Sequence, residues 1–236
     1  MSASDIKEVA DGEERLLGPR VVEIDDGLLA MPRGARLVIL GAGLASRAYR
    51  MRELSESVAF EVDHPASQAL KIERTAGLVP RTRELRRVAV DFERERFADA
   101  LVRAGHMATE PTAWIFEGVI SYLAPCDVEA SIDAIAAQSC AGTRLLATYN
   151  EPSLVRRLYS RASERSGEPH RAMYTREEMQ RLLGERGFVV CSDRDGYQRA
   201  QRWSASPTFF DRRWGRFHHV VIADFERNDA PLATRV

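Results

Sequence analysis

A chain of 236 residues is long enough for one domain, and a composition of 44% hydrophobic and 29% charged residues is that of an ordinary globular protein. The 34 Lys and Arg against 35 Asp and Glu leave a net charge of −1, which gives no reason to expect a nucleic-acid partner. The sequence has no apolar run of roughly 18 residues for a membrane span, and its polar start is unlike a secretory signal peptide. Cys126, Cys140 and Cys191 are too far apart for a compact metal-binding motif, so we expect reduced thiols in a cytoplasmic protein and no metal.

Apolar runs and helical patterns alternate along the chain, as in repeated strand–helix units. The first half predicts a helix over 21–31, a strand over 36–40, a helix ending near 52, a strand over 57–62, a helix over 66–76, a strand over 86–90 and a helix over 97–104. The second half predicts a strand over 112–116, a helix over 125–139, a strand over 143–148, a polar insertion over about 150–171, a capped helix over 175–186 and strands over 188–192 and 217–225. Strands separated by helices of this length imply an α/β fold with a doubly wound, parallel sheet.

Ligands of such sheets bind outside the carboxyl ends of the strands. The residues that follow the predicted strands are therefore the first candidates for a site: Gly41 and Gly43, Asp63, Asp91, Glu117, and Tyr149 with Asn150. Three of these five positions carry a carboxylate. This concentration of acids is the main functional signal in the sequence.

The loop Gly41-Ala42-Gly43 places glycines where the backbone must turn tightly and approach a ligand closely. A dinucleotide-binding loop would have a third small residue so that the next helix can hold a pyrophosphate. Here that position is Ser46, followed by the large cationic Arg47, which argues against a dinucleotide.

Asp63 ends the second strand, 20 residues after Gly43, at the distance where an acid accepts hydrogen bonds from ribose hydroxyls. It could instead cap the following helix. Glu61 lies two residues earlier on the same side of the strand and is a possible substitute.

The acids after the third and fourth strands fit the remainder of an adenosyl ligand. Asp91 could accept from an adenine amino group while Phe92 covers the ring, although Asp91 could also be a helix cap. Glu117 needs a partner that offsets its desolvation, and the ammonium or sulfonium of a cofactor would be one. Because phosphates favour positive charge over carboxylates, the pattern favours S-adenosylmethionine over NAD.

Several segments together resemble the leucine carboxyl methyltransferase family, which includes protein phosphatase methyltransferases and many bacterial S-adenosylmethionine-dependent relatives. The segments are LVILGAGLASRAYR, FEVDHP, RRVAVDF, AWIFEGVISYLAP and GEPHRAMYTREEMQRLLGERGFVV, within residues 20–225. The resemblance implies a class I methyltransferase fold, a Rossmann-like doubly wound sheet of seven strands with the last strand antiparallel. It also implies a methyltransferase domain over 20–236, preceded by a short segment over 1–19.

The resemblance further implies which residues bind S-adenosylmethionine. By motif they are Gly41 and Gly43 in the cofactor loop, Asp63 on the ribose, Asp91 with Phe92 on the adenine, Glu117 beside the cofactor, and Arg20, just before the first helix, on the cofactor's carboxylate. The chain departs from the common bacterial pattern GAGLDTR, because Ala45 and Ser46 stand where that pattern has an acid and a threonine. Its short segment before Arg20 suggests that a partner subunit or a second copy covers the active site.

The expected reaction is O-methylation of a carboxylate on a small molecule or a peptide, since an ionised carboxylate needs no general base. Four arginines could hold such an acceptor: Arg156, Arg157, Arg161 and Arg171. Tyr122, Tyr149 and Asn150 could line the acceptor pocket. His170 would be the base if the acceptor were a hydroxyl or an amine. The pair His218-His219 is expected to be structural.

Two other functions remain open at this point. One is a cofactor-binding subunit without turnover in a larger complex, which the altered glycine loop and the short N-terminal segment suggest. The other is an NAD-dependent oxidoreductase, which Ser46-Arg47 and the acids after strands three and four disfavour.

Overall fold

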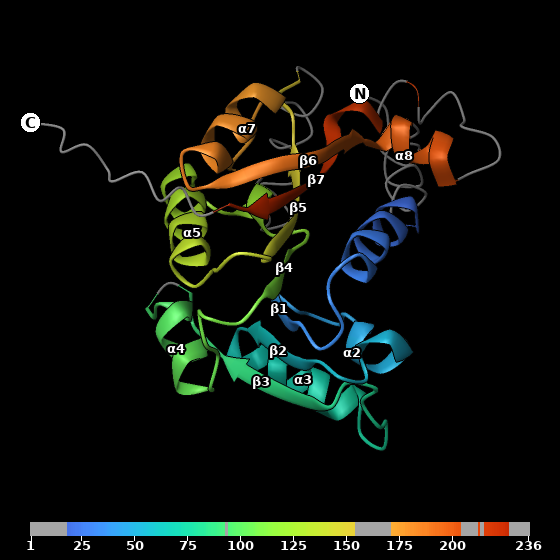
Figure 1. Ribbon diagram of the computed structural model, residues 1–236, viewed down its shortest axis with the longest axis vertical. Helices are drawn as coiled ribbons and strands as arrows, with labels where there is room; N and C mark the ends of the chain where they lie inside the picture. Colours follow the sequence, from blue (N-terminus) through green and yellow to red (C-terminus); the bar gives the residue numbers. More distant parts are fainter. Residues whose placement is uncertain (1–17, 93, 154–170, 204–211, 213–214, 227–236) are drawn as a thin grey trace, which may run out of the picture.

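The computed structural model describes residues 18–92, 94–153, 171–203, 212 and 215–226, and these form three layers, with one twisted sheet between two layers of helices (Figure 1). The strands are β1 (Arg36–Leu40), β2 (Val58–Asp63), β3 (Glu84–Ala89), β4 (Thr112–Phe116), β5 (Arg144–Asn150), β6 (Phe188–Asp195) and β7 (His218–Phe225). Their order across the sheet is β3-β2-β1-β4-β5-β7-β6. β1 to β5 pair in parallel, whereas β7 runs antiparallel to both β5 and β6. The prediction of seven strands with the last one antiparallel is confirmed.

The first helix spans residues 18–29 and is called helix 18–29 below. The others are α2 (Arg47–Arg50), α3 (Pro65–Arg74), α4 (Phe97–Arg103), α5 (Pro125–Ala137), α7 (Arg176–Gly184) and α8 (Gly196–Trp203). On one face of the sheet, α4, α5 and α7 contribute buried residues such as Leu101, Ile132 and Leu183 to the core. On the other face, Ile24 and Leu28 of helix 18–29 pack over β1, β4, β5 and β7. Among the described residues, no helix is both long enough and apolar enough to span a bilayer.

Helix 18–29 fits closely against the sheet at Gly27. A Cβ atom at that position would lie 2.7 Å from methyl groups of both Leu146 and Ile222. The absence of a side chain there lets the helix lie directly over β5 and β7, which brings its first turn to the carboxyl edge of β4.

The structure differs from the sequence prediction at several boundaries. Helix 18–29 begins before residue 21, so Arg20 lies inside the helix and not before it, and the helix crosses the boundary placed between residues 19 and 20. β3 begins at Glu84 rather than at residue 86, because Glu84 pairs with Val58 at the start of β2. α8 occupies a stretch for which the sequence suggested no element. The capping box of Thr175 and Glu178 at the start of α7 is present as expected.

Candidate functional site

The glycine bend after β1 is held directly by Asp63. Gly41 and Gly43 have φ angles of 64° and 42°, which favour glycine. A Cβ on Gly41 would overlap Cγ2 of Val119, so the bend also approaches the loop after β4. The amide of Gly43 donates to Oδ2 of Asp63 at 2.5 Å, and the amide of His64 donates to Oδ1. The cap of α3 is His64, whose ring accepts from the amide of Ala66, so Asp63 is not the cap of that helix.

Glu61 lies away from this bend. Its side chain is fully buried and forms an ion pair with Nζ of Lys71 on α3, at 2.8 Å. Burial raises the pKa of Glu61 above its ordinary value, and the contact with Lys71 acts in the opposite direction. Its carboxylate attaches α3 to the sheet, which makes it a poor substitute for Asp63.

Asp91 and Phe92 follow β3 at the same edge as Asp63. The amide of Val90 donates to the carbonyl of Asp63 at 2.9 Å, which keeps the two strand ends side by side. The Asp91 carboxylate lies 3.5 Å from Nε of Arg94. The Phe92 ring is 42% exposed, and its centroid lies 6.3 Å from that of Phe97. Phe92 therefore offers part of one aromatic surface beside two carboxylates.

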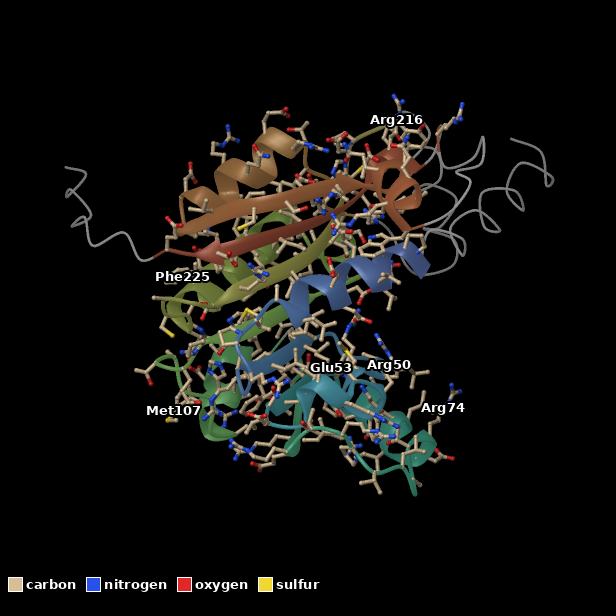
Figure 2. The ribbon with its side chains drawn as sticks, turned by 45° about the vertical axis from the view of Figure 1, so that its right-hand side comes forward. Arg50, Glu53, Arg74, Met107, Arg216 and Phe225 are labelled. Atoms are coloured by element: carbon tan, nitrogen blue, oxygen red, sulfur yellow. The ribbon has the colours of Figure 1, made fainter. Side chains whose placement is uncertain are left out.

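Glu117, at the end of β4, is already paired by the protein. Its Oε1 accepts from Nε of Arg20 and its Oε2 from a terminal nitrogen of Arg47, both at 2.8 Å. Arg47 is buried, and its Nε donates to Asp25 at 2.8 Å. Arg50, which is labelled in Figure 2, also binds Asp25. We call these five residues the arginine rim. Glu117 was expected to need a partner that offsets its desolvation, and two guanidinium groups of the protein are such partners.

The role of Arg47 is not evident from the sequence, in which this residue only argued against the binding of a pyrophosphate. Arg47 is 4% exposed and links helix 18–29 to the carboxyl end of β4. One of its terminal nitrogens is buried and has no hydrogen-bond partner among the described residues. The signal in the sequence was its place in the first turn after the glycine bend, but the acids that face it are 22 and 70 residues away.

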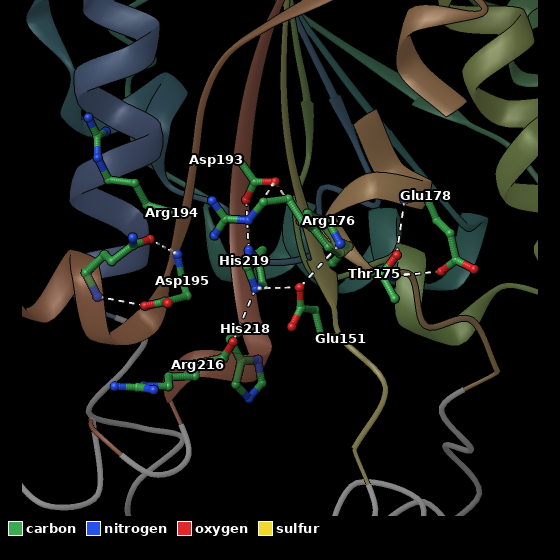
Figure 3. A network of polar contacts seen from close by, with 12 residues as sticks. Glu151, Thr175, Arg176, Glu178, Asp193, Arg194, Asp195, Arg216, His218 and His219 are labelled. Carbon is green, nitrogen blue, oxygen red and sulfur yellow. Dashed lines mark hydrogen bonds and ion pairs between the residues drawn. The ribbon is translucent and has the colours of Figure 1, made fainter. Parts of the chain in front are cut away.

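Tyr149, at the carboxyl end of β5, joins a second polar cluster. Figure 3 shows its members Asp193, His219, Glu151 and Arg176. The hydroxyl of Tyr149 donates to Oδ2 of Asp193 at 2.7 Å, and its ring stacks on His219 with centroids 4.8 Å apart. Nδ1 of His219 lies 2.8 Å from Oδ1 of Asp193, and its Nε2 lies 3.6 Å from Glu151. With Arg176, whose Nε lies 3.9 Å from Asp193, these residues form what we call the β7 network.

This cluster changes the interpretation of Tyr149 and agrees with that of His219. Tyr149 is 2% exposed, and burial, followed by the contact with Asp193, raises the pKa of its hydroxyl. A buried hydroxyl that already donates to a carboxylate does not face an acceptor pocket. His219 lies on β7, buried where that strand pairs with β5 and β6, as expected for a structural histidine.

The remaining acceptor-side residues are only partly described. Tyr122 ends a 3₁₀ turn (Ile120–Tyr122) after β4 and is 41% exposed. The amide of Arg171 donates to the carbonyl of Ser121 at 2.7 Å, which places the start of the segment before α7 beside this turn. Arg156, Arg157, Arg161 and His170 lie outside the described residues.

Comparison with protein families finds that the model of the leucine carboxyl methyltransferase family matches residues 9–136. A candidate S-adenosyl-L-methionine-dependent methyltransferase of Mycobacterium marinum is 46% identical over 110 residues, which cover 46% of this chain and 35% of that protein. One of Mycolicibacterium vanbaalenii is 36% identical over 141 residues, covering 59% of this chain and 45% of that protein. The chain thus matches between about a third and a half of the length of such relatives.

Solved structures share the fold at low sequence identity. A candidate methyltransferase from Thermobifida fusca gives a TM-score of 0.67 at 16% identity, over 92% of this chain and 82% of the other. The magnesium protoporphyrin IX methyltransferase from Synechocystis, solved with bound S-adenosylhomocysteine, gives 0.56 at 12% identity, over 96% and 89%. These similarities show the fold: a seven-stranded class I methyltransferase sheet.

Proposed function

The chain belongs to the leucine carboxyl methyltransferase family, and on this basis we propose that it is a cytoplasmic S-adenosylmethionine-dependent methyltransferase whose acceptor is a carboxylate on a small molecule or a peptide. The observation that carries the proposal is the contact between the Gly43 amide and Asp63. It sets a carboxylate beside a glycine bend at the carboxyl edge of the sheet, where ligands of such sheets bind. Asp91 and Glu117 follow the neighbouring strands at the same edge.

In this proposal each residue of the edge holds one part of the cofactor. Asp63 accepts from the ribose hydroxyls, and Asp91 accepts from the adenine amino group while Phe92 covers the ring. Gly41 and Gly43 keep the backbone free of side chains there. When bound, S-adenosylmethionine supplies a methyl group activated by a sulfonium. Carboxylates at these strand ends suit this cofactor, because it carries positive charge and no phosphate.

The pair of Arg20 and Glu117 suits the amino-acid end of that cofactor. A carboxylate and a guanidinium 2.8 Å apart are complementary to an ammonium and a carboxylate carried on one carbon atom. We propose that Arg20 turns from Glu117 to the cofactor's carboxylate when the cofactor binds. Arg47 then holds Glu117 in place, because its contact with Oε2 is independent of Arg20.

A carboxylate acceptor fits the residues at the edge. It is ionised near neutral pH, so methyl transfer needs positioning in line with the sulfonium more than it needs a base. Tyr122, in the turn after β4, and Arg171, whose amide donates to the neighbouring Ser121, are the described residues that we propose to contact it. A second copy or another subunit is proposed to cover the site.

Titration calorimetry tests the cofactor part of the proposal. Wild-type protein is expected to bind S-adenosylhomocysteine, and Asp63→Ala is expected to weaken that binding by roughly 10- to 100-fold, the value of a lost hydrogen-bond pair to a charged group. Asp99→Ala, which removes an exposed acid from α4, is the control and should bind as the wild type does. Binding of NAD in place of the adenosyl ligand would overturn the proposal.

Transfer is tested with S-adenosylmethionine carrying a radioactive methyl group and a panel of organic acids and peptides. Methyl esters of carboxylates release volatile methanol in alkali, whereas methyl ethers and methylamines do not. Radioactive methanol is therefore the expected product. Cofactor binding with no transfer to any acceptor in the panel or in a cell extract would favour a non-catalytic subunit.

A further inference from the structure

Arg199 on α8 is a buried cation that the proposed function does not use. It is 1% exposed, and one terminal nitrogen donates to the carbonyls of Arg194 at 2.6 Å and His218 at 2.9 Å. Its Nε is buried and has no hydrogen-bond partner in the part of the chain that the structure describes. Both carbonyls belong to strand ends at the carboxyl edge of the sheet, so the guanidinium lies at the same edge as the arginine rim.

The described acids near Arg199 are each bonded to other groups. Glu23 accepts from Arg194 and from Nε1 of Trp203 at 2.6 Å. Asp195 accepts from the amide of Gln198 at 2.7 Å, at the start of α8. Asp193 is held by Tyr149 and His219 in the β7 network. Among the described residues, the hydrogen-bond partners of this guanidinium are two carbonyls, which only partly offset its desolvation.

A second guanidinium increases that cost. Burial, followed by the charge of Arg20, lowers the pKa of Arg199 to about 10, while the charges of Asp195, Glu23 and Asp193 act in the opposite direction. Arg20 lies in the first turn of helix 18–29, where its own bonded partner is Glu117. Helix 18–29 and α8 lie against each other, because Glu23 accepts from Nε1 of Trp203 at 2.6 Å and Asp26 from Arg202 at 3.2 Å. The acid bonded to Arg20 is already shared with Arg47.

We propose that Arg199 and Arg20 form a carboxylate-binding subsite at the β7 end of the candidate site. A bound carboxylate would accept from Arg199 and would offset the repulsion between the two cations. The identity of this carboxylate rests on the proposed function. The reaction supplies two: the methionine carboxylate of the cofactor and the carboxylate of the acceptor.

The test compares Arg199→Gln with Arg202→Gln, which removes a half-exposed arginine three residues later on the same helix. Both proteins are titrated with S-adenosylhomocysteine and with methylthioadenosine, which has the same nucleoside but lacks the amino-acid end. If the subsite holds the cofactor, Arg199→Gln weakens S-adenosylhomocysteine by roughly 10- to 100-fold and leaves methylthioadenosine unchanged. Arg202→Gln changes neither.

A second arm tests the acceptor as the source. Acetate is added to the wild type, free and saturated with S-adenosylhomocysteine, and thermal unfolding is compared with chloride at the same ionic strength. Acetate at about ten times its dissociation constant should raise the midpoint by roughly 3–6 °C in the wild type and in Arg202→Gln, but not in Arg199→Gln. Protection that survives saturation with S-adenosylhomocysteine assigns the subsite to the acceptor.

Equal responses of Arg199→Gln and Arg202→Gln in both arms would overturn the subsite, and Arg199 would then only hold the two strand-end carbonyls. If Arg199→Gln does not fold, Arg199→Lys and Arg20→Gln replace it in both arms. The subsite is also overturned if the wild type responds equally to acetate and chloride and binds S-adenosylhomocysteine and methylthioadenosine equally. Failure of the wild type to bind S-adenosylhomocysteine would instead overturn the proposed function, while the acetate arm on the free protein still decides the subsite.

Discussion

The arginine rim and the β7 network lie at the same edge of the sheet, but they use their acids differently. In the arginine rim, Asp25 and Glu117 are partly exposed and are held by guanidinium groups from helix 18–29 and α2. In the β7 network, Asp193 is 3% exposed and is held by a hydroxyl and an imidazole within one antiparallel unit of three strands. Charge pairs between separate elements can be exchanged for a ligand, whereas a buried, fully bonded acid cannot be exchanged cheaply.

In the proposed function the nucleoside of the cofactor binds on the β1 to β4 side of the sheet, and the β7 network is expected to stabilise the other half. Arg199, which donates to the carbonyls of Arg194 and His218, belongs to neither cluster. Substitutions in one cluster, each compared with a matched substitution nearby, separate the two roles.

Arg47→Ala should have the largest effect on the free energy of unfolding. It removes the buried guanidinium that joins Asp25 to Glu117, and we expect a loss of about 3 kcal/mol in urea unfolding, as for one broken partner of a buried pair. Arg50→Ala removes a 40% exposed arginine from the same Asp25 and should cost at most about 1 kcal/mol. Equal losses would show that the rim is an ordinary surface cluster.

His106 should give the next largest effect, and it provides a contrast with His219. His106 is as buried as His219, but it packs against Phe60 and Trp114, with Thr112 at 3.2 Å, and burial lowers its pKa to about 4. The unfolded chain binds a proton below about pH 6.5, while the folded protein does not until about pH 4. Stability therefore falls as the pH falls through this window.

Between about pH 7 and about pH 5 the wild type should lose about 2 kcal/mol more than His106→Gln, measured by urea unfolding at both pH values. The variant lacks the titrating imidazole, so its loss of unfolding free energy between the two pH values measures the contribution of all other titrating groups. A wild type and a variant with the same pH dependence would show that His106 is protonated in the folded protein.

Asp193→Asn should have the smallest of these effects. The Asn amide has one neutral acceptor oxygen, which can serve Tyr149 or His219, whereas the carboxylate has two charged oxygens and serves both. We therefore expect a loss of about 1–2 kcal/mol in unfolding free energy. Asp195→Asn, two residues later, should be nearly neutral because Asn caps a helix as well as Asp does. Affinity for S-adenosylhomocysteine should be unchanged in both, and a tenfold loss in Asp193→Asn would assign the β7 network to the ligand site.

Local patterns in the chain were enough to predict the order of the strands along the chain, every described helix except α8, and the row of residues after the strands. Periodicity and strand ends are local properties, so the residue pattern alone places Gly41, Gly43, Asp63, Asp91 and Glu117 at one edge of the sheet. The segments that carry the family resemblance are local as well.

Which charges meet depends instead on how the elements pack. Arg20, Arg47 and Glu117 come from elements 27 to 97 residues apart, and Tyr149 meets Asp193 only because β7 inserts antiparallel between β5 and β6. A pairing of this kind requires contacts between helices and strands at long range, which no local pattern encodes. For the same reason Glu61, two residues from Asp63 in the sequence, is bound to Lys71 beneath α3 rather than exposed at the edge.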